Sequence, residues 1–283
     1  MIGLLLSTLA AGSLLFPRDT VIDVRQGDRL LLSDFSGTVF VETWNRPEMS
    51  LDAESDEAVR FRVTRAGNRL DVRVEDRKRR NRAEEIRIVM PPWVDLELSG
   101  RDLEAHVWDV GGAVSIRNLR GDISLRNLTA EVDVHTIEGS IEASGLSGVA
   151  RLRTGDDDLW VGSSTADLEL ETVEGEIHLE GLAARRISLT TTDGDVEFAG
   201  RLLENGEYRF VAHGGDMEFL LAAPVNLDVT VLVYEGEFDS EFPVRTKGYR
   251  TGEELRFTVG NGGGRLVVEA FDGDVELLRM RSR

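Results

Sequence analysis

Apolar and polar residues alternate at every second position along most of this chain, in short runs separated by Gly, Asn or Asp. A two-residue period is typical of β-strands with one buried face, and turn-forming residues between runs mark where strands end. Runs with helical periodicity are nearly absent. The pattern therefore predicts an all-β protein built from many short strands.

One short motif recurs along the chain: Gly, a small or acidic residue, then an apolar, a polar and an apolar residue. Its clearest copies begin at Gly121, Gly139, Gly175, Gly194, Gly215 and Gly273, and looser copies begin at Gly155 and Gly236. Successive glycines from 121 to 236 lie 16 to 21 residues apart, and a second alternating run lies between them. A period of about twenty residues with two strands indicates a repeat architecture.

Such short strands bury only two or three apolar side chains each, so one repeat has no core of its own. Stacked repeats solve this, because equivalent residues then form interior columns. The predicted columns are Ile123, Ile141, Ile177, Val196 and Met217, and beside them Leu125, Ala143, Leu179, Phe198 and Phe219. We therefore predict a parallel β-solenoid, or β-helix, with strands about 4.8 Å apart. Its handedness and its number of faces per turn stay open.

The region before the repeats differs from them. Alternating runs there include a hairpin signal at Ala66-Gly67-Asn68, and Pro91-Pro92 interrupts strand pairing. We interpret residues 18–92 as an antiparallel, hairpin-bearing N-terminal β cap, and residues 93–283 as solenoid repeats continuous with it in one structural domain. Gly273 follows Gly236 by close to two periods, so the repeat is predicted to persist to the C-terminus, past a loop or insertion at 246–254.

The first sixteen residues carry no charge and resemble the apolar region of a secretory signal, with Ala10 and Gly12 as small residues near a cleavage point. No Lys or Arg precedes this region, and an apolar first strand would look similar. We predict that residues 1–17 are a signal peptide and that the protein is exported, to the periplasm or the outside of a bacterial envelope. No other run approaches the eighteen or so apolar residues of a transmembrane span.

Acidic residues outnumber basic ones by 52 to 33, which gives a net charge of −19. Such a chain repels phosphate backbones, so nucleic acid is not an expected partner. A basic run at residues 77–82 is flanked by acidic residues, and we interpret it as a solvated loop between strands. The chain has no cysteine, so it forms no disulfide and no thiolate metal site.

The Gly-Asp-Val and Gly-Ser-Ile repeats follow a strand with the sequence Gly37-Thr-Val-Phe-Val-Glu-Thr-Trp44. In this combination the chain resembles the bacterial DUF4097 family of proposed adhesins, over about residues 30–280. The resemblance implies a β-solenoid-like fold, an exported or membrane-anchored protein and a binding or scaffolding role, with no enzymatic residues to carry over. The chain departs from many members because no transmembrane anchor is recognisable in it.

Motifs of common enzymes are absent from the sequence, including a nucleophile elbow, a Walker loop and a His-Glu-x-x-His zinc motif. The four histidines are His106, His135, His178 and His213. They lack chelating spacing, all are expected to face outward, and they fall at different phases of the repeat, so we predict no histidine-based metal or catalytic site.

Carboxylates are the main candidates for chemistry. Stacking would align Asp122, Asp156, Glu176, Asp195, Asp216 and Glu237 along one corner, with Ser140 as a neutral step. Asp after Gly is ordinary turn chemistry, but carboxylate clusters also supply the hard oxygen ligands that Ca²⁺ prefers. The candidate Ca²⁺ ligands are Asp156, Asp157, Asp158, Asp193, Asp195, Asp272 and Asp274.

Trp108 and Trp160 are expected at outward or corner positions, where they pack or stack on a partner. The sequence as a whole favours a non-enzymatic exported β-solenoid that acts as a surface-interaction, adhesin-like or scaffold protein, with an unidentified protein or glycan partner and no cofactor. Two alternatives stay open: a polysaccharide-processing β-helix enzyme, which requires a cleft bordered by long loops, and a Ca²⁺-stabilised binding solenoid.

Overall fold

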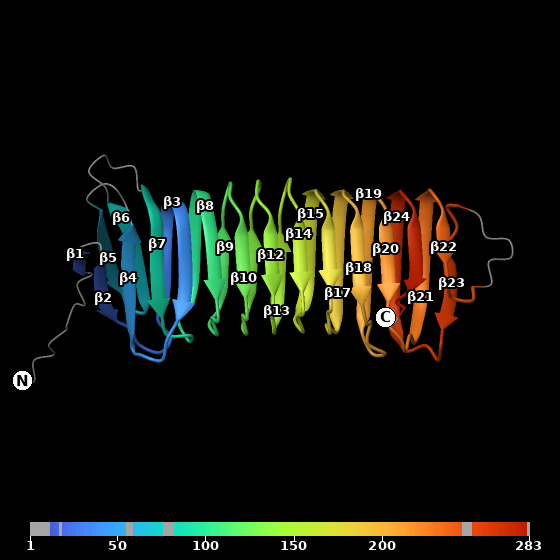
Figure 1. Cartoon of the computed structure of the whole chain (residues 1–283), viewed down its shortest axis with the longest axis horizontal. Coiled ribbons are helices and arrows are strands. Elements are labelled where there is room, and N and C mark those ends of the chain that lie inside the picture. Colours follow the sequence, from blue (N-terminus) through green and yellow to red (C-terminus); the bar gives the residue numbers. More distant parts are fainter. Residues whose placement is uncertain (1–11, 17–18, 55–58, 76–81, 245–250, 282–283) are drawn as a thin grey trace, which may run out of the picture.

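The computed structural model describes residues 12–16, 19–54, 59–75, 82–244 and 251–281, and their strands stack into one elongated solenoid (Figure 1). Each turn of the solenoid, called a rung below, contributes one strand to each of two sheets. In the described part of the chain, no helix has the length and apolar character needed to cross a bilayer. The predicted all-β parallel solenoid is confirmed, and it has two faces per turn.

The two sheets, called face A and face B, lie back to back across a shared core. In its regular part face A consists of β10 (Ile123–Arg126), β12 (Ile141–Ser144), β14 (Leu159–Gly162), β16 (Ile177–Glu180), β18 (Val196–Gly200) and β20 (Met217–Leu221). Face B consists of β9 (Val114–Arg117), β11 (Val132–His135), β13 (Val149–Arg153), β15 (Asp167–Glu174), β17 (Arg186–Asp193) and β19 (Glu207–Gly214). Every neighbouring pair within these two groups is parallel.

Both predicted interior columns are confirmed. Ile123 pairs with Ile141, and Ile177 with Val196 and then Met217, while Phe198 pairs with Phe219 in the second column. Leu159 and Val161 of the irregular repeat complete the two columns. All of these side chains are buried. A fully buried side chain of this size contributes about 1.5–3 kcal/mol relative to an exposed one.

A third interior column, on the face B side of the corner, is polar and was not predicted. Its members are all buried and are Asn118, Thr136, Thr154, Thr172 and Thr191. The Thr154 hydroxyl donates to the Gly139 carbonyl over 2.9 Å, and the Asn118 amide donates to the Leu103 carbonyl over 2.7 Å. These side chains satisfy corner carbonyls that would otherwise be buried without partners. The Thr191 hydroxyl is buried without a hydrogen bond to any described residue.

The N-terminal region is antiparallel only in its outer strands. These are β1 (Gly12–Phe16), β2 (Asp19–Asp23), β4 (Glu48–Glu54) and β5 (Arg60–Ala66). The predicted hairpin at Ala66-Gly67-Asn68 joins β5 to β6 (Arg69–Glu75) and is confirmed. The strand β3 (Arg29–Thr43) differs from the predicted cap, because it runs parallel to β6, to β7 (Arg82–Met90) and to β8 (Asp95–Trp108). It forms a solenoid rung of its own, inserted between β6–β7 and β8.

Part of the predicted signal peptide is included in the described structure. Residues 12–16 form β1, which pairs with β5. Residues 1–11 and 17 lie outside the described residues, as does 76–81, which contains most of the basic run. The signal peptide stays a prediction.

At the C-terminal end the rungs do not stack in the order in which they follow along the chain. The strands there are β21 (Leu227–Glu235), β22 (Phe238–Ser240), β23 (Leu255–Val259), β24 (Gly264–Asp272) and β25 (Val275–Arg279). The last repeat folds back, so β24 lies between β19 and β21, and β25 lies between β20 and β22. A side chain at Gly273 would come within 2.1 Å of the Gly215 carbonyl oxygen. The repeat persists to β25, as predicted, but its last copy stacks between earlier rungs.

Candidate functional site

A ladder of carboxylates runs along the corner where face B turns into face A. Asp195 accepts a hydrogen bond from the Asp216 backbone N–H over 2.8 Å, Asp216 accepts one from Asp274, and Asp274 accepts one from Glu237. The same contact joins Asp122 to Ser140 and Asp158 to Glu176 over 2.9 Å. Each of these carboxylates therefore binds the backbone of the next rung, which differs from the local turn hydrogen bond expected of Asp after Gly.

The predicted corner column is confirmed except at two places. Asp158 takes the position assigned to Asp156, because three Asp residues follow Gly155 where the regular repeats have one residue, and Leu159 is in register with Ile141. Asp274 joins the column because the last repeat folds back. Register follows the buried apolar residue and not the glycine.

The candidate Ca²⁺ ligands are divided between different rungs. Asp157 accepts a hydrogen bond from the Gly139 N–H over 2.6 Å, and Asp158 belongs to the ladder. Asp193 and Asp272 are separated by the rung of Gly214. No group of three or more His, Asp or Glu side chains is arranged to hold a metal ion within the described ranges. The Ca²⁺ hypothesis stays a prediction.

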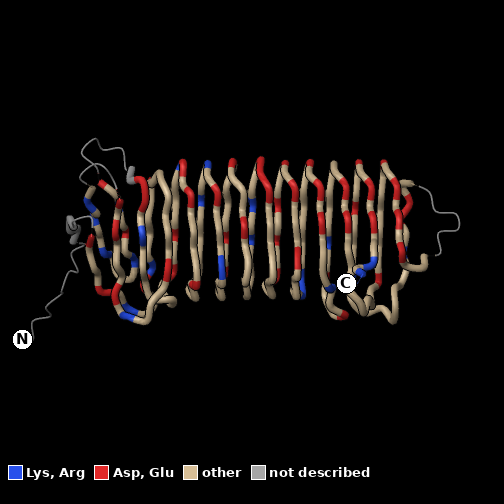
Figure 2. The backbone as a smooth tube through the Cα atoms, in the orientation of Figure 1, with Lys and Arg blue, Asp and Glu red and all other residues tan. Residues whose placement is uncertain are grey.

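Face A carries a second row of carboxylates beside the ladder. Glu197 pairs in register with Glu218, Glu218 with Glu276, and Glu276 with Asp239. We call the two rows together the acidic strip: Asp195, Glu197, Asp216, Glu218, Asp274, Glu276, Glu237 and Asp239. All eight residues are exposed, and Figure 2 shows acidic positions repeated from rung to rung.

The acidic strip has almost no cationic neighbours. His178 contacts Glu197 over 3.0 Å at its edge, and no Lys or Arg of the described chain forms an ion pair with any of its eight members. Neighbouring unit charges at the rung spacing repel by about 1 kcal/mol in bulk water. The strip is therefore a concentrated negative surface.

The second row of the strip was missed at the level of sequence, although its signal was present. In Gly194-Asp-Val-Glu-Phe198, the Asp and Glu are two residues apart, so both face outward when Val196 and Phe198 face inward. The repeats at Gly215 and Gly273 have the same pattern. The predicted column contained only the acidic residue directly after each glycine.

Face B neutralises its charges with ion pairs between rungs. Arg153 contacts Glu169 over 2.9 Å, Glu171 over 3.2 Å and Asp133 over 3.6 Å. The Glu131 carboxylate, hydrogen-bonded to Arg151, raises the pKa of that guanidinium. The acidic strip therefore differs from face B in its electrostatics, while face A outside the strip also has an ion pair between rungs, Arg126 with Glu142 at 3.8 Å.

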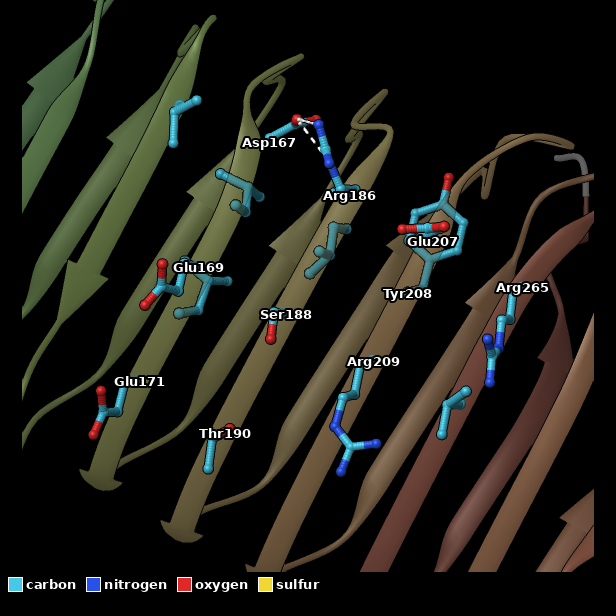
Figure 3. A pocket seen from close by; sticks show the side chains of 15 residues that line it. Asp167, Glu169, Glu171, Arg186, Ser188, Thr190, Glu207, Tyr208, Arg209 and Arg265 are labelled. Carbon is cyan, nitrogen blue, oxygen red and sulfur yellow. Dashed lines mark hydrogen bonds and ion pairs between the residues drawn. The ribbon is translucent and has the colours of Figure 1, made fainter.

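Face B also contains an open hollow of about 840 Å³ (Figure 3). Ser188 and Thr190 of β17 form its floor, Glu169 and Glu171 of β15 form one wall, and Arg209 of β19 forms the other. A row of alternating charge crosses one end of it and consists of Asp167, Arg186, Glu207 and Arg265.

Tyr208 lies in the core beneath this hollow. Its hydroxyl accepts a hydrogen bond from the Leu203 N–H over 2.7 Å and donates one to the Ala184 carbonyl over 3.1 Å. Burial raises the pKa of the Tyr208 phenol, and the Leu203 N–H opposes that shift. The phenol is therefore favoured in its neutral form.

All four histidines lie at exposed or half-buried positions, as predicted. His106 stacks on Phe40 with ring centroids 4.7 Å apart and lies near Trp108, over which Arg126 is placed. His213 stacks on Phe271, which stacks on Tyr234. Trp160 pairs with Glu142 and His178 on the outer side of face A, so both predicted outward tryptophans are confirmed.

This chain is similar to solved structures and to one family model. The curated proteins gave no match. A proposed cell adhesion protein from Clostridium sporogenes is 10% identical, with 93% of this chain and 99% of that chain covered and a TM-score of 0.26. A proposed adhesin from Parabacteroides merdae is 8% identical, with 93% and 95% covered and a TM-score of 0.43. The Toastrack DUF4097 family model matches residues 28–278, so the resemblance in the repeats is confirmed and the chain belongs to the Toastrack DUF4097 family.

Proposed function

We propose that this protein is a non-catalytic, adhesin-like surface-interaction solenoid whose acidic strip binds a cationic partner. The acidic strip itself carries the proposal, because eight exposed carboxylates lie on four neighbouring rungs without Lys or Arg partners in the described structure. The solenoid holds them at a fixed spacing, so a partner with several Lys or Arg residues forms charge-assisted contacts with many of them at once.

Binding is favoured over catalysis by the connections between strands. A polysaccharide-processing enzyme of this architecture is expected to have a cleft bordered by long loops. The connections that follow β15, β16, β17 and β18, next to the hollow, contain only two to six residues. We place the protein at the surface of the bacterial envelope, with the export signal in the apolar segment before β1 and a basic segment of a surface protein as the partner.

The test is binding of a lysine-rich peptide to two variants with equal loss of charge. One is Glu197→Gln/Glu218→Gln/Glu276→Gln on face A, and the other is Glu169→Gln/Glu171→Gln/Glu269→Gln on face B. Three exposed charge pairs change affinity by roughly tenfold, so the face A variant should bind about ten times more weakly at low salt. The face B variant should bind nearly as well as the wild-type protein. Equal weakening of both variants would show that only net charge matters and would overturn the proposal.

Calcium is an alternative cation for the same corner. Asp195, Asp216 and Asp274 each use one carboxylate oxygen for the ladder, and the second oxygen forms no hydrogen bond with any described residue. Carboxylate oxygens are the ligand type that a hard divalent ion prefers, but in the described residues no three of these side chains converge on one point. This alternative predicts a rise in melting temperature that is specific to Ca²⁺.

A further inference from the structure

The hollow on face B differs chemically from the acidic strip. Its lining contains four carboxylates, Asp167, Glu169, Glu171 and Glu207, and three guanidinium groups, Arg186, Arg209 and Arg265. The lining is therefore almost neutral in a chain whose net charge is −19. A polycation is attracted to the acidic strip instead, and a polyanion is repelled by the molecule as a whole.

The charged walls of the hollow are held in place from outside it. Glu169 and Glu171 are paired with Arg153 on β13, at 2.9 and 3.2 Å. Arg209 is paired with Glu269 on β24 at 3.0 Å. Since these partners lie on the far sides of β15 and β19, they orient the wall side chains without filling the space above β17. Such positioning lowers the cost of ordering side chains when a ligand binds.

The floor of the hollow offers free hydroxyl groups. Ser188 and Thr190 are exposed, and neither hydroxyl is hydrogen-bonded within the described structure. Both side chains are short, whereas Glu169 and Arg209 on either side are long. The backbones of β15 and β19 are two strand spacings apart, or about 9.6 Å, so the hollow follows β17 as a groove with a polar floor.

The groove lacks the large exposed apolar side chains on which most protein interfaces are centred. Hot spots in protein interfaces are centred on buried aromatic or large apolar side chains and on Arg. The exposed apolar lining here is limited to Val149 at the edge and the half-buried Val267. What the groove does offer is a mixed set of donors and acceptors in fixed positions, which matches a ligand that is rich in hydroxyl groups and has no charge.

We propose that this groove binds a neutral oligosaccharide segment lying along β17. Glu169 and Glu171 accept hydrogen bonds from sugar hydroxyls, Arg209 donates to sugar oxygens, and Ser188 and Thr190 do both. This is a second binding activity, on the opposite face from the acidic strip.

The test uses a panel of immobilised neutral, acidic and amino oligosaccharides with the full chain. Ser188→Trp fills the groove, and Ser115→Trp is the matched control. Ser115 lies on β9, in the same outward column as Ser188. Asp133, Arg151 and Glu169 occupy that column on the strands between them. The wild-type protein and Ser115→Trp should bind neutral oligosaccharides, and Ser188→Trp should lose at least tenfold in affinity. Thr190→Tyr, a second exposed change in the floor, should do the same.

Several results would overturn the proposal. These are no binding of any neutral oligosaccharide at millimolar concentration, binding that Ser188→Trp and Thr190→Tyr leave unchanged, or binding only to acidic or amino sugars. Equal melting temperatures of Ser188→Trp and Ser115→Trp show that the loss is not due to unfolding. The face A variant Glu197→Gln/Glu218→Gln/Glu276→Gln should retain oligosaccharide binding. Failure of the oligosaccharide proposal is therefore distinguishable from failure of the proposal for the acidic strip.

Discussion

Faces A and B are made from the same rungs, yet only their interiors are alike. Val196 and Phe198 of β18 and Ile187 and Leu189 of β17 are all buried in continuous columns. On the outside, Glu197 stacks between His178 and a series of further carboxylates, whereas face B alternates acids with arginines. The interior columns therefore specify the fold, while the outward columns are free to acquire different binding properties.

In-register parallel stacking explains the acidic strip physically. A residue repeated in each motif is placed directly above its own copy, so a repeated acid becomes a row of like charges. The repulsion is modest because the row is exposed to water and salt. The hydrogen bonds that backbone N–H groups donate to Asp195, Asp216 and Asp274 offset part of the repulsion.

The largest expected effect is the difference in stability between a buried and an exposed substitution on face A. Phe219→Ala should lower the free energy of unfolding by about 3–5 kcal/mol, because Phe219 is fully buried and packs on Phe198 and Phe210. The adjacent exposed change Glu218→Ala should change the free energy of unfolding by no more than about 1 kcal/mol. Denaturant midpoints of the two variants measure the contrast. Similar denaturant midpoints would contradict the conclusion that the interior columns specify the fold and the outward columns do not.

A smaller effect concerns the polar group in the core beneath face B. Tyr208→Phe should lower stability at neutral pH by about 1–3 kcal/mol, because the Leu203 N–H and the Ala184 carbonyl lose their partner. The unfolded phenol loses its proton near pH 10, while the raised pKa keeps the folded phenol neutral. The stability from this neutral phenol is present below pH 10 and is lost as pH rises further.

The difference in free energy of unfolding between the wild-type protein and Tyr208→Phe should therefore become smaller from pH 9 to about pH 11. Unfolding free energies of both proteins at the two pH values measure it. A difference that stays constant with pH would contradict the assigned environment of Tyr208.

Neutralising one charge should have opposite effects on the two faces. Glu218→Gln removes repulsion with Glu197 and Glu276 and should raise stability by up to about 1 kcal/mol at low salt. Arg153→Gln removes pairs with Glu169 and Glu171 and should lower stability by up to about 1 kcal/mol. Both effects should shrink in about 1 M NaCl, where the Debye length is about 3 Å. If both variants change stability in the same direction, the proposed electrostatic difference between the acidic strip and face B is wrong.

The smallest expected effect is that of Ca²⁺ on the acidic strip. Millimolar Ca²⁺ should raise the melting temperature by about 2–4 °C relative to EDTA at the same ionic strength, which corresponds to about 1 kcal/mol. Circular dichroism follows the transition. The rise should be smaller in the Glu197→Gln/Glu218→Gln/Glu276→Gln variant. If Mg²⁺ and Ca²⁺ act equally, the effect is general screening and the Ca²⁺ alternative loses its support.

Residues in the regular repeats were predictable because their partners are one period away. Ile123 and Ile141 were assigned to one column from spacing alone, and their register is as expected. Asp156 was assigned to the corner by counting from Gly155, and Asp158 takes that place because Leu159 must reach the core. Where spacing and burial disagree, burial decides, since an unfilled core position costs more than a longer turn.

The groove on face B was not predictable in the same way. Arg265 and Val267 line it because β24 lies beside β19. Had the repeats continued in order, β21 would lie there, and Asp228 and Thr230 would take the places of Arg265 and Val267. The charge of one end of the groove therefore depends on how the last repeat folds back.

By itself, the sequence determined the strands, their inward and outward residues, the two strands per period and the parallel stacking, because alternation and period are local properties. Only the tertiary structure decided the order of rungs at both ends, where β3 and β24–β25 insert between rungs that follow each other in the chain. The physical reason is that all rungs present similar apolar columns, so many stacking orders bury similar surface. The choice among them is made by contacts between distant segments, which no local pattern contains.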